Sequence, residues 1–304
     1  MSDETVGAAA AGTWRLGDLT VNRLGFGAMR LTSTADGRPS DGARAIGVLR
    51  RAVELGVDHI DTASFYVSDL RSANELINSA LGGPYPDNLV ITTKVGPGKD
   101  ANGEWTPAAR PDQLRGQVEE NLRQLGRDHL DVVNLRVHAA DSVAERFGVL
   151  AELRGAGLIR HLGVSNVRAH QLAEAMAIAP VVCVQNRYGL GIRGDDELLA
   201  ECGRLGIAFV PFFAIVGSRT AAIGAGGGTA APGEEAEVVG EVARAHGASP
   251  AQIRLAWTLH RGPHVLAIPG TGDPDHLEAN IAAGAIRLSP AELARLDGLG
   301  ALAG

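Results

Sequence analysis

Short apolar runs alternate along the chain with longer segments in which hydrophobic residues recur every three or four positions. The runs are rich in β-branched residues and predict eight strands, at 23–28, 59–61, 89–94, 131–137, 159–164, 181–185, 208–212 and 265–268. The spacings of three and four predict helices near 41–55, 72–81, 111–125, 142–154, 168–178, 196–205, 234–246, 250–260 and 274–283. Strands that alternate with helices form parallel sheets, so this order predicts a closed (β/α)8 barrel of the TIM type.

The remaining segments complete a single-domain organisation. Residues 217–235 have no hydrophobic periodicity, which predicts a long loop after the seventh strand, and residues 288–299 predict an extra C-terminal helix. We expect residues 1–13 to be disordered and residues 14–304 to form the barrel. An open doubly wound sheet is the alternative, but the GxGxxG turn expected after its first strand is incomplete in LGFGAMR (24–30).

The composition of the chain argues against several classes of binding partner. A formal net charge of -7, without a cluster of Lys and Arg, argues against nucleic acid. No apolar run approaches the length of about 18 residues that a membrane span needs. The two cysteines, Cys183 and Cys202, belong to no CxxC motif, and no histidines stand at metal-binding spacing. We therefore expect a reduced, cytoplasmic protein without a metal site.

Polar residues gather at the carboxyl ends of the predicted strands. Inward positions of a barrel can be polar near this rim, because active sites of such barrels lie there. The residues concerned are Asp61, Lys94, Asn134, Arg136, His138, Ser165, Asn166 and Gln185. Since an unpaired buried charge is costly, Asp61 and Lys94 on neighbouring strands are expected to pair. Such a pair could also be purely structural.

Tyr66 adds a candidate proton donor, because it follows Asp61 by five positions and can fold back over the rim. An ammonium group beside a phenol favours the phenolate, so the phenol can give up a proton and take it back. Asp61 would then orient Lys94. No nucleophile with an adjacent base is apparent, so the proton must accompany another transferred group, and hydride is the natural companion.

Six stretches resemble the aldo-keto reductase family, over a region from about residue 14 to 300. They are GVDHIDTASFY (56–66), SANELINSAL (72–81), ITTKVG (91–96), IRHLGVSN (159–166), VQNRY (184–188) and IPGTGDPDHLEAN (268–280). The resemblance implies a (β/α)8 barrel that transfers hydride between NAD(P)H and a small-molecule carbonyl substrate without metal or flavin. It places Asp61, Tyr66 and Lys94 at three of four catalytic positions, and it implies a monomer or a weak homo-oligomer.

The fourth catalytic position departs from the pattern of the family. Members usually have a His five residues after the Asp of strand four, whereas here Asp131 is followed at that distance by Arg136, and His138 comes two residues later. Both side chains point the same way, about 6–7 Å apart along the strand. Arg136 would offer a fixed charge to the developing alkoxide, whereas neutral His138 would orient the carbonyl. We favour Arg136, with His138 as the alternative.

The resemblance also implies a nicotinamide site. Ser165, Asn166 and Gln185 would hold the carboxamide group, because an amide side chain can both donate and accept hydrogen bonds. Phe212 would stack on the nicotinamide ring where the family usually has Tyr. The further cofactor candidates are Gly27, Met29, Gly217, Ser218, Gly270, Thr271, His276 and Asn280.

The adenosine end of this site also departs from the commonest pattern. Gly270 and His276 stand where many members have Lys and Arg, so two fixed charges for a 2′-phosphate are missing. NADP(H) is still favoured, because Thr271, His276 and helix amides could hold a phosphate. NAD(H) is the alternative cofactor.

The substrate is indicated by a narrower resemblance. LDVVNLR (130–136), GLIRHLGVSNV (157–167) and VVCVQNRY (181–188) are similar to the pyridoxal reductase subgroup of the family, which implies an aromatic aldehyde such as pyridoxal. Met29, Arg30, Phe65, Trp105 and Phe213 are expected to line the pocket, with Arg30 placed to meet an anionic substituent.

Two other functions remain as alternatives. In a Schiff-base enzyme Lys94 would be the nucleophile, but pairing with Asp61 would keep its amine protonated. The second alternative is a catalytically weak module of the same fold that binds NADP(H) as a redox sensor.

Overall fold

The computed structural model describes residues 6–32, 41–68, 71–99, 104–106, 108–138, 142–215 and 232–301. Seven parallel strands form one curled sheet in the order β13-β12-β11-β10-β7-β4-β3. These strands are β3 (Phe26–Gly27), β4 (His59–Asp61), β7 (Val90–Val95), β10 (Leu130–Arg136), β11 (Ile159–Ser165), β12 (Val181–Gln185) and β13 (Ala208–Phe209). Their order follows the chain, as expected for successive βα units.

The eighth predicted segment, 265–268, closes the sheet through two bridges instead of a longer ladder. Val265 pairs with Phe209, and Ala267 pairs with Leu24, both in parallel. Backbone hydrogen bonds of 2.8–2.9 Å join this segment to the last strand at Phe209 and to the first strand segment at 23–25. The structure is therefore the single-domain (β/α)8 barrel that the sequence predicts.

Two glycines permit the close approach of the first and last strand segments. A Cβ atom on Gly27 would lie 2.6 Å from the carbonyl oxygen of Ile268, and one on Gly270 would lie 2.4 Å from that of Gly27. Side chains at these positions would push the two segments apart. Gly27 and Gly270, both predicted to bind the cofactor, thus also serve the closure of the barrel.

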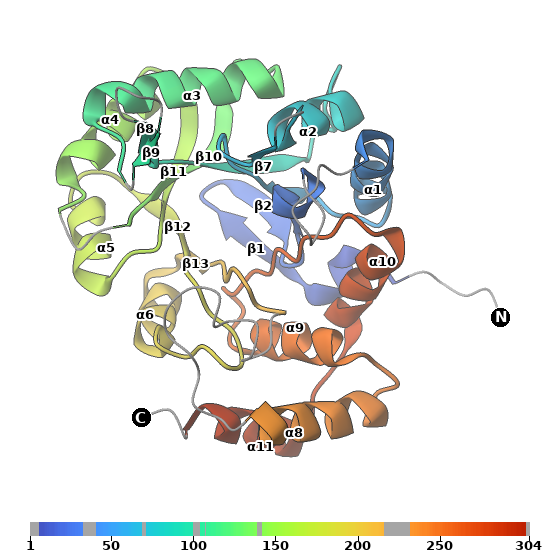
Figure 1. Ribbon diagram of the computed structural model, residues 1–304. Coiled ribbons are helices and arrows are strands. Elements are labelled where there is room, and N and C mark those ends of the chain that lie inside the picture. The colour runs from blue at the N-terminus through green and yellow to red at the C-terminus, as the bar shows by residue number, and fades with distance from the viewer. Residues whose placement is uncertain are drawn as a thin grey trace.

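Helices surround the barrel, as Figure 1 shows. They are α1 (Gly42–Glu54), α2 (Ala73–Leu81), α3 (Pro111–Leu125), α4 (Ala144–Gly155), α5 (Ala169–Met176), α6 (Asp196–Leu205), α8 (Pro232–Ala245), α9 (Pro250–His260), α10 (Pro274–Ala282) and α11 (Pro290–Ala301). Side-chain caps start several of them: Asp41 caps α1, Ser72 caps α2, and Ser249 forms a capping box at α9. The predicted C-terminal helix is α11, which packs on α8 outside the ring. Most of the predicted loop 217–235 lies outside the described residues.

An antiparallel hairpin that the sequence analysis missed covers the amino-terminal end of the barrel. It consists of β1 (Thr13–Leu16) and β2 (Leu19–Asn22), seen through the ring of helices in Figure 1. Leu16 and Val21 belong to the same buried cluster as inward residues of the strands, among them Val132. The hairpin therefore seals this end and leaves the opposite end for a site.

Residues 8–11 also differ from the expected disorder. They form the 3-10 turn η1 (Ala8–Ala11), and the backbone N–H of Ala8 donates to the carbonyl of Leu55 at 2.8 Å. Ala8 and Ala11 are buried against the main core. Small side chains let this segment lie close to the barrel, so the Ala-rich stretch has a packing role.

Short hairpins lie at the carboxyl ends of two strands. Two small hairpins follow β4 and β7 at their carboxyl ends: β5 (Val67–Ser68) with β6 (Arg71–Ser72), and β8 (Gly98–Lys99) with β9 (Trp105–Thr106).

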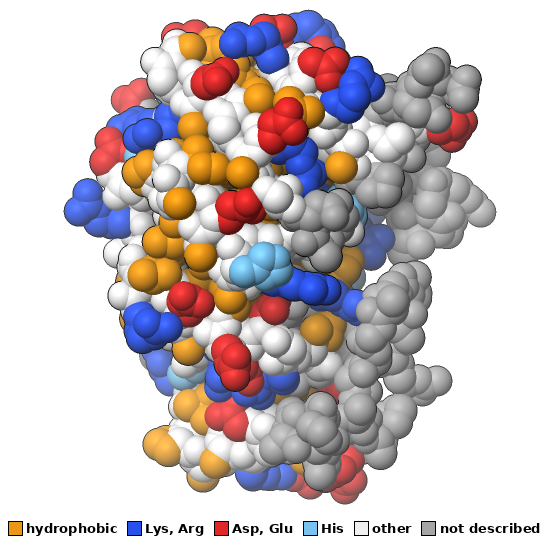
Figure 2. Space-filling view, turned by 90° about the vertical axis from the view of Figure 1, so that its left-hand side faces the viewer, with side chains coloured by type: hydrophobic (Ala, Val, Ile, Leu, Met, Phe, Trp, Pro, Cys, Tyr) orange, Lys and Arg blue, Asp and Glu red, His pale blue; other side chains and the backbone are white. Residues whose placement is uncertain are grey.

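On the face shown in Figure 2, basic and acidic side chains are interspersed. Within the described ranges, no helix has the length and apolar character that crossing a membrane requires.

The alternation of β10 fixes which residues face the barrel interior. Val133 and Leu135 belong to the core between the sheet and the helices, whereas Val132 belongs to the interior cluster. Asn134 and Arg136 share the parity of Val132, so they face inward, as predicted. Polar residues thus occupy the inner positions toward the carboxyl end of the strand.

His59 lies inside the barrel, where it makes stability depend on pH. Its ring is buried, and Nε2 lies 3.0 Å from Oγ1 of Thr92. Burial lowers the pKa of His59 from 6.5 to about 4, so the folded protein holds it neutral while the unfolded chain binds a proton below pH 6.5. Neutral His59 contributes about 3 kcal/mol to the free energy of unfolding. This contribution is complete above pH 6.5 and is lost as the pH falls toward 4.

We therefore expect the midpoint of urea denaturation to be lower at pH 4.5 than at pH 7. The variant His59→Gln should remove much of this dependence of stability on pH. Denaturation of both proteins at the two pH values measures it. An equal loss of stability in both would show that His59 is not the group responsible.

Candidate active site

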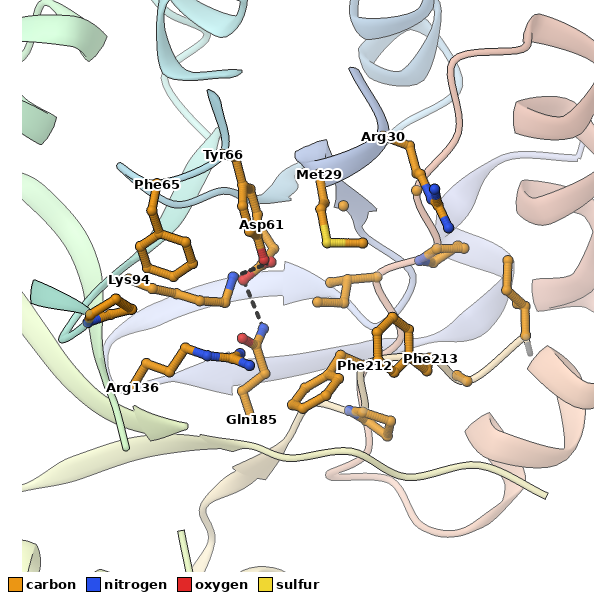
Figure 3. A pocket seen from close by; sticks show the side chains of 18 of the residues that line it. Met29, Arg30, Asp61, Phe65, Tyr66, Lys94, Arg136, Gln185, Phe212 and Phe213 are labelled. Carbon is orange, nitrogen blue, oxygen red and sulfur yellow. Dashed lines mark hydrogen bonds and ion pairs between the residues drawn. The ribbon is translucent and has the colours of Figure 1, made fainter. Parts of the chain in front are cut away.

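A cavity of about 610 Å³ opens at the carboxyl ends of the strands, opposite the hairpin. Its wall combines apolar side chains with a few convergent polar groups, as Figure 3 shows. All five predicted catalytic residues line it: Asp61, Tyr66, Lys94, Arg136 and His138. Such a cavity is the usual form of a small-molecule site.

The predicted ion pair between Asp61 and Lys94 is confirmed. Lys94 Nζ donates to Asp61 Oδ1 at 2.6 Å and to the carbonyl of Thr62 at 3.0 Å. The side chain of Lys94 is only 2% exposed and that of Asp61 only 4%. Gln185 Nε2 donates to the other oxygen of Asp61 at 2.7 Å, so both carboxylate oxygens are engaged. This network fixes the ammonium group in one position.

Tyr66 lies directly beside this ammonium group. Lys94 Nζ is 4.9 Å from the centroid of the Tyr66 ring. The loop after β4 is held by a turn from Tyr66 N to Ala63 O at 3.1 Å and by a bond from Ala73 N to Tyr66 O at 2.9 Å. Burial disfavours the charged form of Lys94, but Asp61 and then Tyr66 outweigh it and raise the pKa of Lys94. A phenol therefore faces a permanent cation, as predicted.

Arg136 and His138 contact each other at the cavity wall. Arg136 Nε donates to His138 Nε2 at 3.1 Å. Partial burial, together with the charges of Arg136 and Arg146, lowers the pKa of His138 and keeps the ring neutral as an acceptor. Arg136 extends into the cavity, as Figure 3 shows, and its guanidinium carbon lies 5.4 Å from the Phe212 ring centroid. His138 is the more exposed of the two.

Unsatisfied polar atoms lie where a carboxamide is expected. Ser165 pairs with Gln185 across β11 and β12. Ser165 Oγ and Gln185 Oε1 are buried and have no hydrogen-bond partner in the described part of the chain. Such atoms are costly unless a ligand satisfies them. A nicotinamide carboxamide carries both a donor and an acceptor, so these residues fit it.

Asn166 and Phe212 stand beside this position. Asn166 is exposed, adopts a left-handed backbone with φ of 61°, and donates from Nδ2 to the carbonyl of Val137 at 2.6 Å. Asn tolerates this conformation better than most residues. Phe212 lines the cavity after β13 and makes an edge contact with Phe213. Gly217 and Ser218 lie outside the described residues.

The expected adenosine contacts lie beyond the cavity wall, on α10 and the turn before it. Thr271 and Asn280 are buried there, and His276 is exposed. Asp273 Oδ1 already accepts the N–H groups of Asp275 and His276, at 2.9 and 3.2 Å. Two of the helix amides that the sequence analysis offered to a phosphate therefore bond to the capping carboxylate in this structure.

A cation that sequence reasoning missed stands at the same turn. Arg44 on α1 contacts Asp273 at 2.6 Å and is half exposed. The two residues are 229 positions apart, so no local pattern could have paired them. Arg44 thus brings a guanidinium to the amino-terminal end of α10, where it is paired with the carboxylate of Asp273.

The aromatic wall of the cavity agrees in part with expectation. Met29, Arg30, Phe65 and Phe213 line it as predicted, whereas the side chain of Trp105 lies outside what the structure describes. Phe213 has a φ of 67°, a strained conformation for a bulky residue, and such strain is often retained at binding sites. Sequence reasoning missed further lining residues, namely Pro97, Thr106, Pro211, Ala214, Ile215, Ile268 and Pro269.

Comparisons with known proteins agree on one family. The model described as "Aldo/keto reductase family" matches residues 23–301. Pyridoxine 4-dehydrogenase of Escherichia coli is 43% identical over 298 residues, covering 95% of this chain and 99% of the relative.

Two solved structures share the fold. A thermostable aldo-keto reductase in complex with epalrestat is 29% identical, with a TM-score of 0.77 over 95% of this chain and 99% of that one. An aldo/keto reductase from Klebsiella pneumoniae, in complex with NADP and acetate, is 28% identical, with a TM-score of 0.75 over 95% of each chain.

Proposed function

Because this chain belongs to the aldo/keto reductase family, we propose that it is an NADPH-dependent reductase that converts an aldehyde to an alcohol. The observation that carries the proposal is the buried Asp61–Lys94 pair beside the Tyr66 phenol, at the wall of an apolar cavity. Among the described residues that line this cavity there is no Ser or Cys for a base to activate, whereas a proton donor and a fixed cation are both in place.

Each residue has a defined task in this reaction. When bound, the reduced nicotinamide supplies a hydride to the carbonyl carbon. Tyr66 gives its proton to the carbonyl oxygen, and Lys94 stabilises the resulting phenolate until solvent returns the proton. Asp61 holds Lys94 in position, and Gln185 holds the other oxygen of Asp61. Arg136 presents N–H groups to the charge that develops on the same oxygen.

Relatives support the choice of cofactor and substrate. The related K. pneumoniae structure contains NADP, and the E. coli relative is a pyridoxine 4-dehydrogenase. Ser165 and Gln185 fit the nicotinamide group, and Arg44 brings a guanidinium to the amino-terminal end of α10. We therefore propose NADP(H) as the preferred cofactor, NAD(H) as the weaker one, and pyridoxal as the first candidate substrate.

Oxidation of NADPH and of NADH in the presence of an aldehyde panel that includes pyridoxal tests this function. We expect turnover with NADPH and at least one aromatic aldehyde. A protein that binds NADPH tightly but turns over no aldehyde would instead fit the redox-sensing alternative.

The fourth catalytic role can be assigned by two alanine variants. We expect Arg136→Ala to lower kcat by about 100-fold, as loss of a donor to a developing oxyanion does, and His138→Ala to lower it by less than about 10-fold. Arg136 extends into the cavity (Figure 3), whereas His138 is exposed and accepts a hydrogen bond from Arg136. A large loss in His138→Ala alone would reverse the assignment.

A further inference from the structure

Among the described residues, Arg136 is a cation without a counter-ion. In the described part of the chain no carboxylate lies within ion-pair distance of it, and its one hydrogen bond within that part goes from Nε to neutral His138. Within the described ranges, the cavity wall carries three permanent cations, Arg30, Lys94 and Arg136, but a single carboxylate, Asp61. Both oxygens of Asp61 are already taken by Lys94 and Gln185. A half-buried guanidinium in this setting calls for an anion from the ligand.

The geometry of Arg136 suits two neighbouring oxygens. Its Nε is used by His138, so the terminal nitrogens remain for the ligand. Figure 3 shows the guanidinium end of Arg136 turned into the cavity near Gln185 and Phe212. A guanidinium presents parallel N–H groups in a rigid fork, whereas a histidine at this position could donate a single bond. The change from His to Arg therefore adds a second donor beside the reacting carbonyl.

We propose that Arg136 selects aromatic aldehydes that carry an ionisable hydroxyl group on the ring carbon next to the aldehyde-bearing carbon. This inference rests on the proposed function and names the substrate class of the same site. In such a molecule the aldehyde oxygen and the phenolate oxygen lie side by side in one plane, and the fork binds both. The phenolate supplies the anion that the cavity lacks. Pyridoxal has this arrangement.

The position of the hydroxyl group matters because the aldehyde oxygen must meet Tyr66. A hydroxyl group opposite the aldehyde then points away from Arg136, toward the mouth of the cavity. The exposed Arg30 could attract an anion there, but it could not bind both oxygens. Phe65, Phe213 and Pro97 provide an apolar wall for the flat ring. Recognition of the adjacent hydroxyl group is thus assigned to Arg136 alone.

The test compares kcat/KM for 2-hydroxybenzaldehyde, 4-hydroxybenzaldehyde and 2-methoxybenzaldehyde with saturating NADPH. We expect wild-type protein to prefer the 2-hydroxy compound over each of the others by at least about 10-fold, the effect of one good charge-assisted contact. Arg136→Lys keeps the charge but removes the fork, and Arg136→His restores the family's usual residue. Both variants should bring the ratio of kcat/KM for the 2-hydroxy compound to that for the 4-hydroxy compound close to one. Arg30→Ala should keep this ratio at the wild-type value or raise it, because Arg30 can attract only the 4-hydroxyl group.

Binding of the aldehydes to protein loaded with NADP+ gives the same comparison without turnover, because the oxidised cofactor has no hydride to give. Calorimetry with 2-hydroxybenzaldehyde and 4-hydroxybenzaldehyde on this protein decides the question if a variant is inactive. A wild-type ratio near one, or a ratio that survives Arg136→Lys, would overturn the inference while leaving the reductase function intact. Failure to oxidise NADPH with any of the three aldehydes or with pyridoxal would count against the proposed function itself.

Discussion

Replacing Tyr66 with Phe is expected to lower kcat for aldehyde reduction by about 1000-fold and to leave the dissociation constant of NADPH nearly unchanged. The substitution removes one hydroxyl group and keeps the ring that stands 4.9 Å from Lys94 Nζ. Without that hydroxyl group the carbonyl oxygen has no positioned proton donor. Steady-state oxidation of NADPH gives kcat, and quenching of protein fluorescence gives the cofactor affinity.

Tyr85→Phe is the matched control for this substitution. The Tyr85 hydroxyl group donates to the carbonyl of Leu125 at 2.7 Å, away from the residues that line the cavity. Its loss should reduce stability slightly and leave kcat unchanged. A Tyr66→Phe protein that reduces aldehydes at the wild-type rate would show that another group gives the proton.

Replacing Lys94 with Met is expected to impair both activity and stability. Asp61 would keep its bond from Gln185 but lose its counter-ion in a site that is 4% exposed. Breaking a buried pair on one side costs about 3–5 kcal/mol, because the remaining charge is left uncompensated. Turnover should fall by about 100-fold or more, since the cation that stabilises the phenolate is gone. Urea denaturation and steady-state kinetics measure the two effects.

Two further variants separate the structural role of this pair from its catalytic role. Adding Asp61→Asn to Lys94→Met removes the orphaned charge, so stability should recover in part while activity should not. Arg254→Met breaks another buried pair, Arg254–Glu235, which lies outside the cavity wall. It should lower stability and leave kcat unchanged. Full recovery of turnover in the double variant would contradict a catalytic role for Lys94.

The sequence predicts the barrel well because its strands obey a simple rule. Inward and outward positions alternate, and this alternation alone places Asn134 and Arg136 inside and Leu135 outside. The ion pair of Asp61 and Lys94 follows from the cost of burying either charge alone. These expectations depend on local pattern and general energetics, so they can be read without knowledge of the tertiary structure.

Contacts that join distant parts of the chain could not be read in this way. The hairpin of β1 and β2 is short, and its burial depends on the completed barrel. The pairing of Arg44 with Asp273 spans 229 positions. Strand alternation placed Arg136 and His138 on one side, but it did not reveal that the two side chains bond to each other. Pro97 and Ile215 reach the cavity from loops and Thr106 from the short strand β9, and no hydrophobic periodicity describes the course of these segments.

Transfer of deuterium tests the central claim most directly. The protein is incubated with pyridoxal and NADPH that carries deuterium at the transferable position of the nicotinamide ring, and the alcohol is analysed by mass spectrometry and NMR. We expect one deuterium on the carbon that was the carbonyl carbon, formed by wild-type protein and nearly absent with Tyr66→Phe. An alcohol product without deuterium at that carbon, or oxidation of the cofactor without any alcohol, would contradict hydride transfer to an aldehyde at this site.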